Sequence, residues 1–428
     1  MNATSNLQLA VQFFFQIGVI LVVCRAVGIV AKWLGQPQVV AEMIAGVMLG
    51  PSLFGLFAPD WQQWIFPWDR TQTTRDTQSY IFPASQLGLA LYMFVVGLEF
   101  RVDILKSHFK SSLMVSLAGM IAPFALGGLL AYYFHRYTRL FPEATTLMEA
   151  MLFLGASMCI TAFPMLARII HFKGLTGTLM GTVAIGAGAI DDAMAWCLLA
   201  VVLASFDANP SHALFSIGGG IIFVAVAMLV IRPILDRLKS YWIDRDGVLN
   251  DSGFVVGLIV MAFGAWFTDK IHLHAVFGAF VIGSCIPRGA MSRDLIARVQ
   301  PLAVALLLPL FFTYSGLNTK IGLLDTAYLW AVCGLVLGAA ILGKFGACWL
   351  AARWSGIPQR ESLGIGTLMN ARGLMELIII NIGLDRGIIS QELFAMLVIM
   401  AVTTTLIASP IFDALVGSQK YIDTEPLV

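Results

Sequence analysis

The sequence predicts an all-α polytopic membrane protein with about thirteen transmembrane helices. Of its 428 residues, 59% are hydrophobic and only 12% are charged, whereas soluble domains carry about 25% charged residues. The mean hydropathy is +0.85. Apolar windows of roughly 20 residues, long enough to cross a bilayer as helices, recur along the whole chain.

The windows are separated by charged or Pro- and Gly-rich turns, and several are short or are interrupted by Gly and Pro. In chain order they cover 9–31, 38–57, 83–100, 113–134, 147–170, 178–205, 214–232, 252–268, 273–287, 301–317, 327–352, 361–383 and 392–415. The N-terminus lacks a basic region and a small-residue cleavage site, so the first window is expected to remain as a span.

Thirteen spans would place successive connections on alternating sides of the membrane, and the basic residues are concentrated in one of the two resulting sets of connections. One set of connections contains Lys32, Arg101, Lys106, Lys110, Arg168, Lys173, Arg232, Arg237, Lys239, Arg245, Arg288, Arg293, Arg298, Arg353, Arg360 and Lys420. The other contains Arg70, Arg75, Arg136, Arg139, Lys270, Lys320 and Arg386. Because cytoplasmic loops are enriched in Lys and Arg, we expect the N-terminus outside and the C-terminus in the cytoplasm.

Few charged residues remain inside the spans: Arg25, Glu42, Glu99, Asp191, Asp192, Lys344, Arg372 and Glu376. Intramembrane charges are functional candidates because their burial is costly. Arg25 and Glu99 lie near span ends, where a long side chain reaches the membrane surface, and we expect structural roles for them. Glu42 is compatible with a packing role and with a functional one.

Asp191 and Asp192 are neighbours in the middle of an apolar run. Each mid-membrane carboxylate costs roughly 2.5–3.5 kcal/mol on insertion, and each Leu, Val or Ile returns only about 0.3–0.6 kcal/mol. The pair therefore needs partners or water inside the protein. Adjacent helical residues point about 100° apart, so one carboxylate can meet a basic partner while the other faces a water-filled cavity.

The fifth and twelfth windows carry polar residues and helix breakers at mid-span. These are Ser157, Thr161 and Pro164 in the fifth window and Asn370, Arg372, Gly373 and Glu376 in the twelfth. Interrupted helices are tolerated in a membrane where the freed backbone lines a cavity. Pro-kinked packing helices are the alternative interpretation.

The two interrupted windows occupy the same place in two series of six spans. Because an odd number of spans separates the start of one series from the start of the next, the second series is inverted relative to the first. We therefore predict a membrane domain over 1–415, with inverted halves of about 1–205 and 252–415, a linker helix at about 214–232 and a short cytoplasmic tail at 416–428. Interrupted segments at matching positions of inverted halves predict the midplane binding site of a secondary transporter.

Several other function classes are disfavoured. The net charge of +1 is not the basic field of a nucleic-acid-binding protein. The six cysteines show no CxxC spacing, so we expect neither a disulfide framework nor a cysteine metal site. The stretch GAGAID lacks the strand-then-helix context of a dinucleotide loop, and no cofactor is predicted. An intramembrane aspartyl protease needs aspartates that face each other from different helices, so we expect no enzyme.

Six motifs carry a resemblance to a known family. They are GQPQVVAEMIAGVMLGPS (35–52), LYMFVVGLEF (91–100), ITAFPMLARI (160–169), AIDDAMAW (189–196), ILGKFGA (341–347) and MNARGLMELI (369–378). With them the chain resembles the monovalent cation:proton antiporters, in the branch of the bacterial Na+/H+ antiporters and the potassium efflux antiporters. The resemblance implies a thirteen-helix inverted-repeat fold, with a core domain of two crossed, discontinuous helices that moves against a dimerisation domain.

The resemblance also implies roles for particular residues. Asp192 matches the acid that binds the cation or proton, and Thr161, at the first helix break, would assist as a ligand. Asp191 would pair with Lys344, as in electrogenic members. Supporting roles at the two breaks fall to Ser157, Asn370, Arg372 and Glu376. Some relatives carry a carboxylate where this chain has Ala162, so Arg372 and Glu376 are expected to compensate the helix dipoles.

The expected function is therefore exchange of a monovalent cation for protons. Na+ is favoured, Li+ and K+ stay open, and the full Asp-Asp pair indicates an electrogenic cycle. A K+/H+ antiporter is the alternative, and a cation channel is less favoured. The expected setting is a bacterial plasma (inner) membrane, with a homodimer surrounded by membrane lipid. No nucleotide-binding regulatory domain is expected after the last span.

Overall fold

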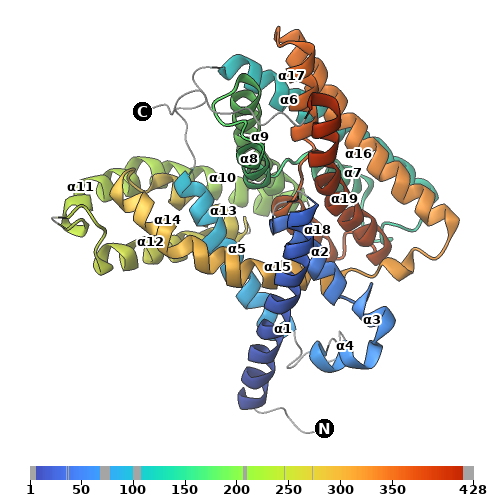
Figure 1. Ribbon diagram of the computed structural model, residues 1–428, viewed down its shortest axis with the longest axis horizontal. Helices are drawn as coiled ribbons and strands as arrows, with labels where there is room; N and C mark the ends of the chain where they lie inside the picture. Colours follow the sequence, from blue (N-terminus) through green and yellow to red (C-terminus); the bar gives the residue numbers. More distant parts are fainter. Residues whose placement is uncertain are drawn as a thin grey trace. The chain divides into compact units, whose positions relative to one another are not determined.

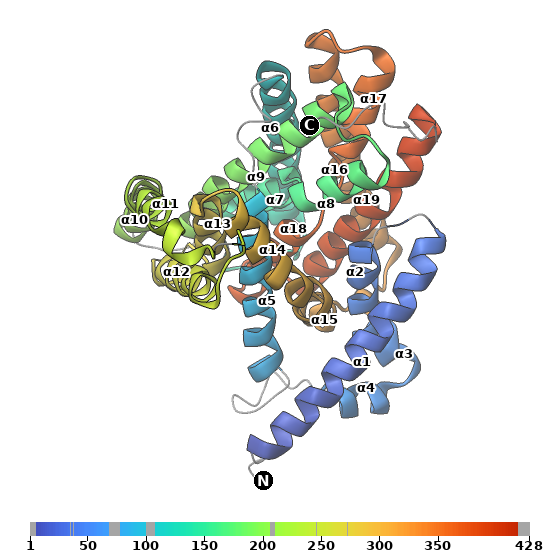
Figure 2. The same cartoon turned by 60° about the vertical axis from the view of Figure 1, so that its left-hand side comes forward.

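The computed structural model describes residues 6–34, 36, 38–67, 78–99, 108–205, 210–244, 246–271 and 273–417, and most of them are helical (Figures 1 and 2). Contacts divide the chain into two compact units. Unit 1 contains residues 1–26, 45–100 and 203–318, and unit 2 contains residues 27–44, 101–202 and 319–428. Each unit thus combines segments that are far apart in the sequence.

The helices are distributed between the units as follows. Unit 1 holds α3 (Phe54–Phe57), α4 (Pro59–Ile65), α5 (Gln78–Glu99), α10 (Pro210–Val226), α11 (Arg232–Trp242), α12 (Asp251–Lys270), α13 (Ala275–Cys285), α14 (Ala290–Leu302) and α15 (Leu308–Asn318). Unit 2 holds α6 (Phe109–Tyr137), α7 (Leu147–Cys159), α8 (Phe163–Phe172), α16 (Ala327–Trp354), α17 (Gln359–Leu368), α18 (Leu374–Asp385) and α19 (Gln391–Val416). Three helices contribute to both: α1 (Asn6–Trp33), α2 (Gln38–Leu49) and α9 (Leu179–Ser205).

The predicted fold class is confirmed, with one difference in the number of spans. In the described part of the chain, 10 helical stretches are long and apolar enough to cross a membrane. None of the other three predicted windows is occupied by one long, uninterrupted helix. Window 273–287 contains α13, of only 11 residues, and windows 147–170 and 361–383 contain the pairs α7–α8 and α17–α18, each divided by non-helical residues.

Unit 1 is held together by very close helix contacts at glycines. A Cβ on Gly97 of α5 would overlap the carbonyl of Phe280 in α13, and a Cβ on Gly316 of α15 would overlap the carbonyl of Gly46 in α2. Small residues allow the backbones of membrane helices to approach closely. The resulting van der Waals packing holds the helices together, because lipid is itself apolar and supplies no hydrophobic driving force between them.

Prolines explain two π-helical turns in unit 1. The turn Ala227–Ile231 comes just before Pro233, and the turn Ala303–Leu307 lies between Pro301 and Pro309. Proline lacks an N–H and clashes with the carbonyl four residues earlier, so the hydrogen-bond ladder widens locally while the helix continues. Both long spans remain continuous through these turns.

In unit 2, α6 packs along α7 and α16 (Figures 1 and 2). A Cβ on Gly127 of α6 would lie 2.7 Å from the carbonyl oxygen of Leu154 in α7. An apolar cluster that includes Leu166, Val183 and Leu368 joins α8, α9 and α17. This packing fixes the helices that carry the predicted site.

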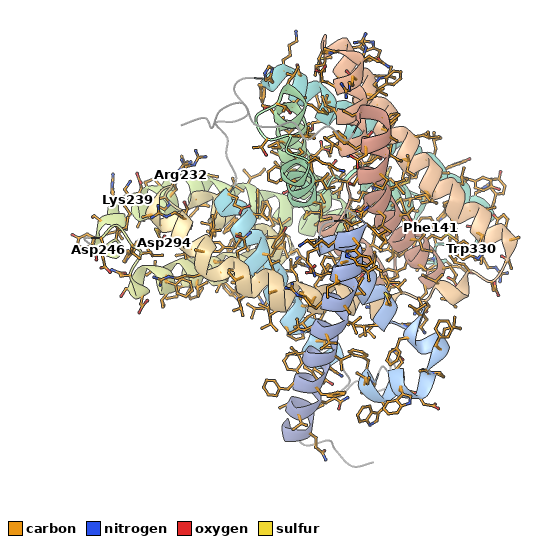
Figure 3. All side chains as sticks on the ribbon, in the orientation of Figure 1. Phe141, Arg232, Lys239, Asp246, Asp294 and Trp330 are labelled. Carbon is orange, nitrogen blue, oxygen red and sulfur yellow. The ribbon has the colours of Figure 1, made fainter. Side chains whose placement is uncertain are left out.

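Within each unit, hydrogen bonds join connections that the distribution of basic residues assigns to the same side of the membrane. In unit 1, the backbone N–H of Leu249 donates to Asp294 at 2.8 Å, and Figure 3 shows Asp294 at the same end as Arg232 and Lys239. In unit 2, the hydroxyl of Thr145 donates to the carbonyl of Ile388 at 3.0 Å. Several basic residues of that distribution lie outside the described residues: Arg70, Arg75, Arg101, Lys106, Arg245 and Lys420.

Candidate functional site

The two interrupted helix pairs cross each other in unit 2 through their non-helical residues. The α7–α8 pair is broken at residues 160–162 and the α17–α18 pair at residues 369–373. The backbone N–H of Ala162 donates to the carbonyl of Ala371 at 3.2 Å. A Cβ on Gly373 would lie 2.8 Å from Cγ of Met165 and 3.2 Å from Cβ of Ala162, so glycine permits this close crossing.

Two cationic side chains bind the carbonyl groups at the C-terminus of α7. Arg372 donates from Nη1 to the carbonyl of Ser157 at 3.2 Å and from Nη2 to that of Met158 at 2.7 Å. Lys344 of α16 donates to the carbonyl of Cys159. The last carbonyls of a helix lack helical partners and carry partial negative charge, so cations stabilise this end.

Glu376 balances the charge of Arg372. Its Oε1 lies 3.1 Å from Nη1 of Arg372, and both side chains are buried. Glu376 is in the first turn of α18, where the positive end of the helix dipole favours a carboxylate. Arg372 and Glu376 therefore stand at opposite dipole ends of the crossing, where the sequence analysis expected dipole compensation.

Asp191 of α9 is fully buried and accepts hydrogen bonds from three donors. Nζ of Lys344 lies 3.1 Å from its Oδ2. The hydroxyl of Thr161, at the break after α7, donates to the same oxygen at 2.5 Å. The hydroxyl of Ser116, on α6, donates to Oδ1 at 2.5 Å. These bonds satisfy both oxygens of the carboxylate.

Asp192 is also fully buried, yet its carboxylate has a different environment. Neither Oδ1 nor Oδ2 accepts a hydrogen bond from any residue that the structure describes. The rotation of about 100° between helical neighbours takes Asp192 away from the donors that surround Asp191. A buried carboxylate in this position needs a proton or a bound cation to compensate its charge.

Comparison with known proteins decides the family. A family model described as "Sodium/hydrogen exchanger, transmembrane" matches residues 18–417. The chain belongs to the sodium/hydrogen exchanger family. The Na(+)/H(+) antiporter NhaS4 of Synechocystis sp. is 38% identical to this exchanger over 397 residues, which cover 92% of this chain and 94% of that protein.

Two further matches extend this result. The K(+)/H(+) antiporter 1 of Saccharomyces cerevisiae is 32% identical over 420 residues, and the match covers 96% of this chain but only 46% of the yeast protein. The solved structure of the sodium proton antiporter MjNhaP1 from Methanocaldococcus jannaschii has a TM-score of 0.61 at 15% identity, covering 96% of this exchanger and 98% of that chain. This last likeness establishes the exchanger fold.

The remaining predicted residues of the exchanger have varied surroundings. The hydroxyl of Ser157 donates to the carbonyl of Phe153 in its own helix at 2.8 Å. Oδ1 of Asn370 has no hydrogen-bond partner among the described residues, and Asn370 lines a cavity of about 170 Å³ between α16, α17 and α19. Arg25 and Glu99, expected near span ends, are exposed.

Two residues at the site were not identified from the sequence. Ser116 binds Asp191, and Thr405 of α19 binds the break near Arg372, accepting from the N–H of Arg372 at 3.2 Å and donating to its carbonyl at 2.8 Å. Serine and threonine are common in membrane helices and often bond to their own backbone. The only sequence signal for Ser116 is its spacing from Ser112, which places two hydroxyls on one face of α6.

Proposed function

We propose that this protein is a secondary active transporter that exchanges a monovalent cation, with Na+ favoured, for protons across the membrane. The observation that carries the proposal is Asp192, a buried carboxylate whose oxygens have no partner among the described residues, beside a neighbour that is fully hydrogen-bonded. Membership of a family of sodium/hydrogen exchangers supports it.

Competition for Asp192 explains how exchange arises. A proton or a cation can each neutralise the carboxylate, but an empty charged site is costly to carry through the membrane. Hard cations bind oxygen ligands, and the hydroxyl oxygen of Thr161 keeps lone pairs after donating its proton to Asp191. We assign Asp192 as the main ligand, with Thr161 and backbone carbonyls freed at the helix breaks as supporting ligands.

The Asp191–Lys344 pair supports an electrogenic cycle. Both side chains are fully buried, and the Nζ–Oδ2 distance is 3.1 Å. If cation binding at Asp192 loosens this pair, Lys344 also gives up a proton, and two protons move against one cation. The assignment of Lys344 as a second proton carrier belongs to this proposal.

K+/H+ exchange is the second candidate, favoured by the similarity to the yeast protein named K(+)/H(+) antiporter 1. We further propose a homodimer in a bacterial plasma membrane, with the N-terminus outside and the C-terminus in the cytoplasm. The inverted halves 1–205 and 252–415 are part of the same proposal.

The test compares wild type with Asp192→Asn. Everted vesicles that contain either protein are energised, and dequenching of a pH dye is recorded after addition of Na+, K+ or Li+ in parallel. We expect wild type to respond to Na+, and Asp192→Asn to fold but lose the response, because the isostere removes the exchangeable charge together with its desolvation cost. Wild-type exchange by purified Asp192→Asn would overturn the assignment.

A further inference from the structure

Thr405 of α19 binds the second helix break through both backbone groups of one residue. The N–H of Arg372 donates to the hydroxyl oxygen of Thr405 at 3.2 Å. The hydroxyl proton is shared between the carbonyls of Arg372 and Ala401, each 2.8 Å from the hydroxyl oxygen. Within the part of the chain that the structure describes, no other residue binds these two backbone groups of Arg372. Thr405 is buried, so its hydroxyl spares the break two unpaired polar groups in the protein interior.

The preceding residue, Thr404, shows what a threonine in this helix does otherwise. Its side chain is also fully buried, and its hydroxyl is directed to the carbonyls of Met400 at 2.8 Å and Ala401 at 3.1 Å, both in α19 itself. Such a bond to the preceding turn is the ordinary behaviour of threonine inside a helix. α19 therefore carries one threonine that bonds only within its own helix and a neighbour, Thr405, that also anchors the break.

The anchored residue is joined to the first helix break by a short path. Ala371 precedes Arg372 in the chain, and its carbonyl accepts the N–H of Ala162 at 3.2 Å. Ala162 in turn follows Thr161, which we assign as a supporting cation ligand. Every link between Thr405 and Thr161 is thus a hydrogen bond or a peptide bond. A displacement of the second break would be transmitted along this path to the oxygen of the first break.

We propose that Thr405 is a positioning residue that holds the second helix break in register with the first and thereby sets the affinity of the site for the cation. This role rests on the proposed exchange function. Ligand atoms must be held within about 0.5 Å of their productive positions by the residues behind them. Without the hydroxyl, the backbone of Arg372 would shift to find new partners, and the ligand oxygens at the two breaks would shift with it.

The proposed role affects affinity more than the exchange step itself. Asp192, the residue assigned as the main ligand, lies on α9 and has no contact with Thr405 in the hydrogen bonds of the site. The exchangeable charge therefore remains when the Thr405 hydroxyl is removed. A merely structural threonine would lower the amount of folded protein and leave the cation concentration for half-maximal exchange unchanged.

The experiment measures Na+-induced exchange in proteoliposomes over a series of Na+ concentrations at one fixed pH. It compares wild type, Thr405→Val, Thr405→Ser and Thr404→Val, with rates expressed per amount of folded protein. We expect Thr405→Val to raise the KM for Na+ by about threefold to tenfold, because a hydrogen bond of typical net strength is lost, with a maximal rate close to that of wild type. Thr405→Ser keeps the hydroxyl and should follow wild type. Thr404→Val, the matched control, removes a buried hydroxyl that binds only its own helix and should follow wild type as well.

A binding measurement checks the same effect without transport. Purified protein in detergent is unfolded thermally at increasing NaCl, with choline chloride keeping the ionic strength constant. A cation that binds the folded protein raises the midpoint of unfolding, and in Thr405→Val this rise should need about threefold to tenfold more Na+ than in wild type.

The outcomes separate this role from the proposed function. Exchange with an unchanged KM in Thr405→Val, or an equal rise of KM in Thr404→Val or Thr405→Ser, overturns the role of Thr405 and leaves the exchange function intact. Absence of exchange in wild type overturns the function and the role with it. If Thr405→Val does not fold, Thr405→Ala is compared with Thr404→Ala in the same assays, and equal KM values for these two variants reject the role.

Discussion

Asp191 and Asp192 are chemically identical neighbours, yet a single helical step gives them opposite surroundings. Asp191 accepts three hydrogen bonds, one of them from a buried cation. Asp192 accepts none from the described residues. The first carboxylate is therefore suited to remain charged through the cycle, and the second is suited to change its occupant. Substitutions at the two positions should impair transport in different ways.

The charge balance of the cycle is predicted to depend on Asp191 and Lys344. Asp191→Asn alone would leave Lys344 as a buried cation without its counter-charge, so we combine it with Lys344→Gln. The double variant should retain some exchange but lose its dependence on membrane potential, because only the proton at Asp192 then moves against the cation. Exchange is measured in proteoliposomes with and without a valinomycin-clamped K+ potential, using Na+ as the test cation. Wild-type exchange that ignores the imposed potential would show that the pair is only structural.

The charged residues of the candidate site and Thr161 at the first helix break were identified from the sequence, whereas the hydroxyl-bearing residues Ser116 and Thr405 were not. Asp191, Lys344 and Arg372 are conspicuous because a charge inside an apolar span is costly. Ser116 and Thr405 carry no such cost, since a hydroxyl can bond to its own helix. Only the three-dimensional packing of α6 against α9, and of α19 against the break after α17, turns these hydroxyls toward the site.

At the scale of elements, the crossing depends on capping a helix that ends inside the protein. The carbonyls of Ser157, Met158 and Cys159 would lack partners without Arg372 and Lys344. The sequence predicted both interruptions, because their breakers stand in apolar windows. It left open whether these windows were broken or only kinked, since that depends on the partner segment that supplies the N–H of Ala162 and the carbonyl of Ala371.

Substitution of Arg372, which caps the end of α7, should destabilise the fold more than substitution of its partner Glu376. Arg372→Gln deprives the end of α7 of a cation and leaves Glu376 as an unpaired buried carboxylate, so we expect a loss of roughly 3–5 kcal/mol in the free energy of unfolding. Glu376→Gln should cost less, because Arg372 keeps the carbonyls of Ser157 and Met158. The double variant should be more stable than Arg372→Gln alone.

These stabilities are compared by thermal unfolding in detergent. Lys239→Gln is the control, because Lys239 pairs with Asp236 on the surface, and an exposed pair contributes only about 0–1 kcal/mol. Equal losses of stability in Arg372→Gln and Glu376→Gln would contradict the capping role of the guanidinium. A double variant whose loss of stability equals the sum of the two single losses would contradict it as well.

At the scale of the whole molecule, hydropathy located the spans without indicating which of them pack together. The predicted halves 1–205 and 252–415 are contiguous in sequence, whereas each compact unit draws segments from both. Apolar windows look alike in composition, and glycine contacts such as Gly46 with Gly316 join residues far apart in the chain. The inverted relation of the halves stays a prediction.

Loop contacts support the alternation of the spans within each unit. In unit 1, Asp294 and Leu249 belong to two connections that the basic-residue bias assigns to the same side, and they are hydrogen-bonded. In unit 2, Lys173 lies 2.6 Å from Asp413, near the cytoplasmic end expected for α19. A single error in the number of spans between these connections would have placed the partners on opposite sides.

Single-cysteine labelling tests the orientation that follows. Cys197 is the exposed member of the six cysteines and the other five are buried, so variants are made in a Cys197→Ala background. Arg293→Cys should react with a membrane-impermeant maleimide in everted vesicles, because Arg293 lies in a connection of the basic-rich, cytoplasmic set. Lys270→Cys and Lys320→Cys, in the poorer set, should react in intact cells. The background protein, unlabelled until it is denatured, is the control. Reaction of all three variants from one side would overturn the span alternation, and reaction of each from the opposite side would place the N-terminus in the cytoplasm.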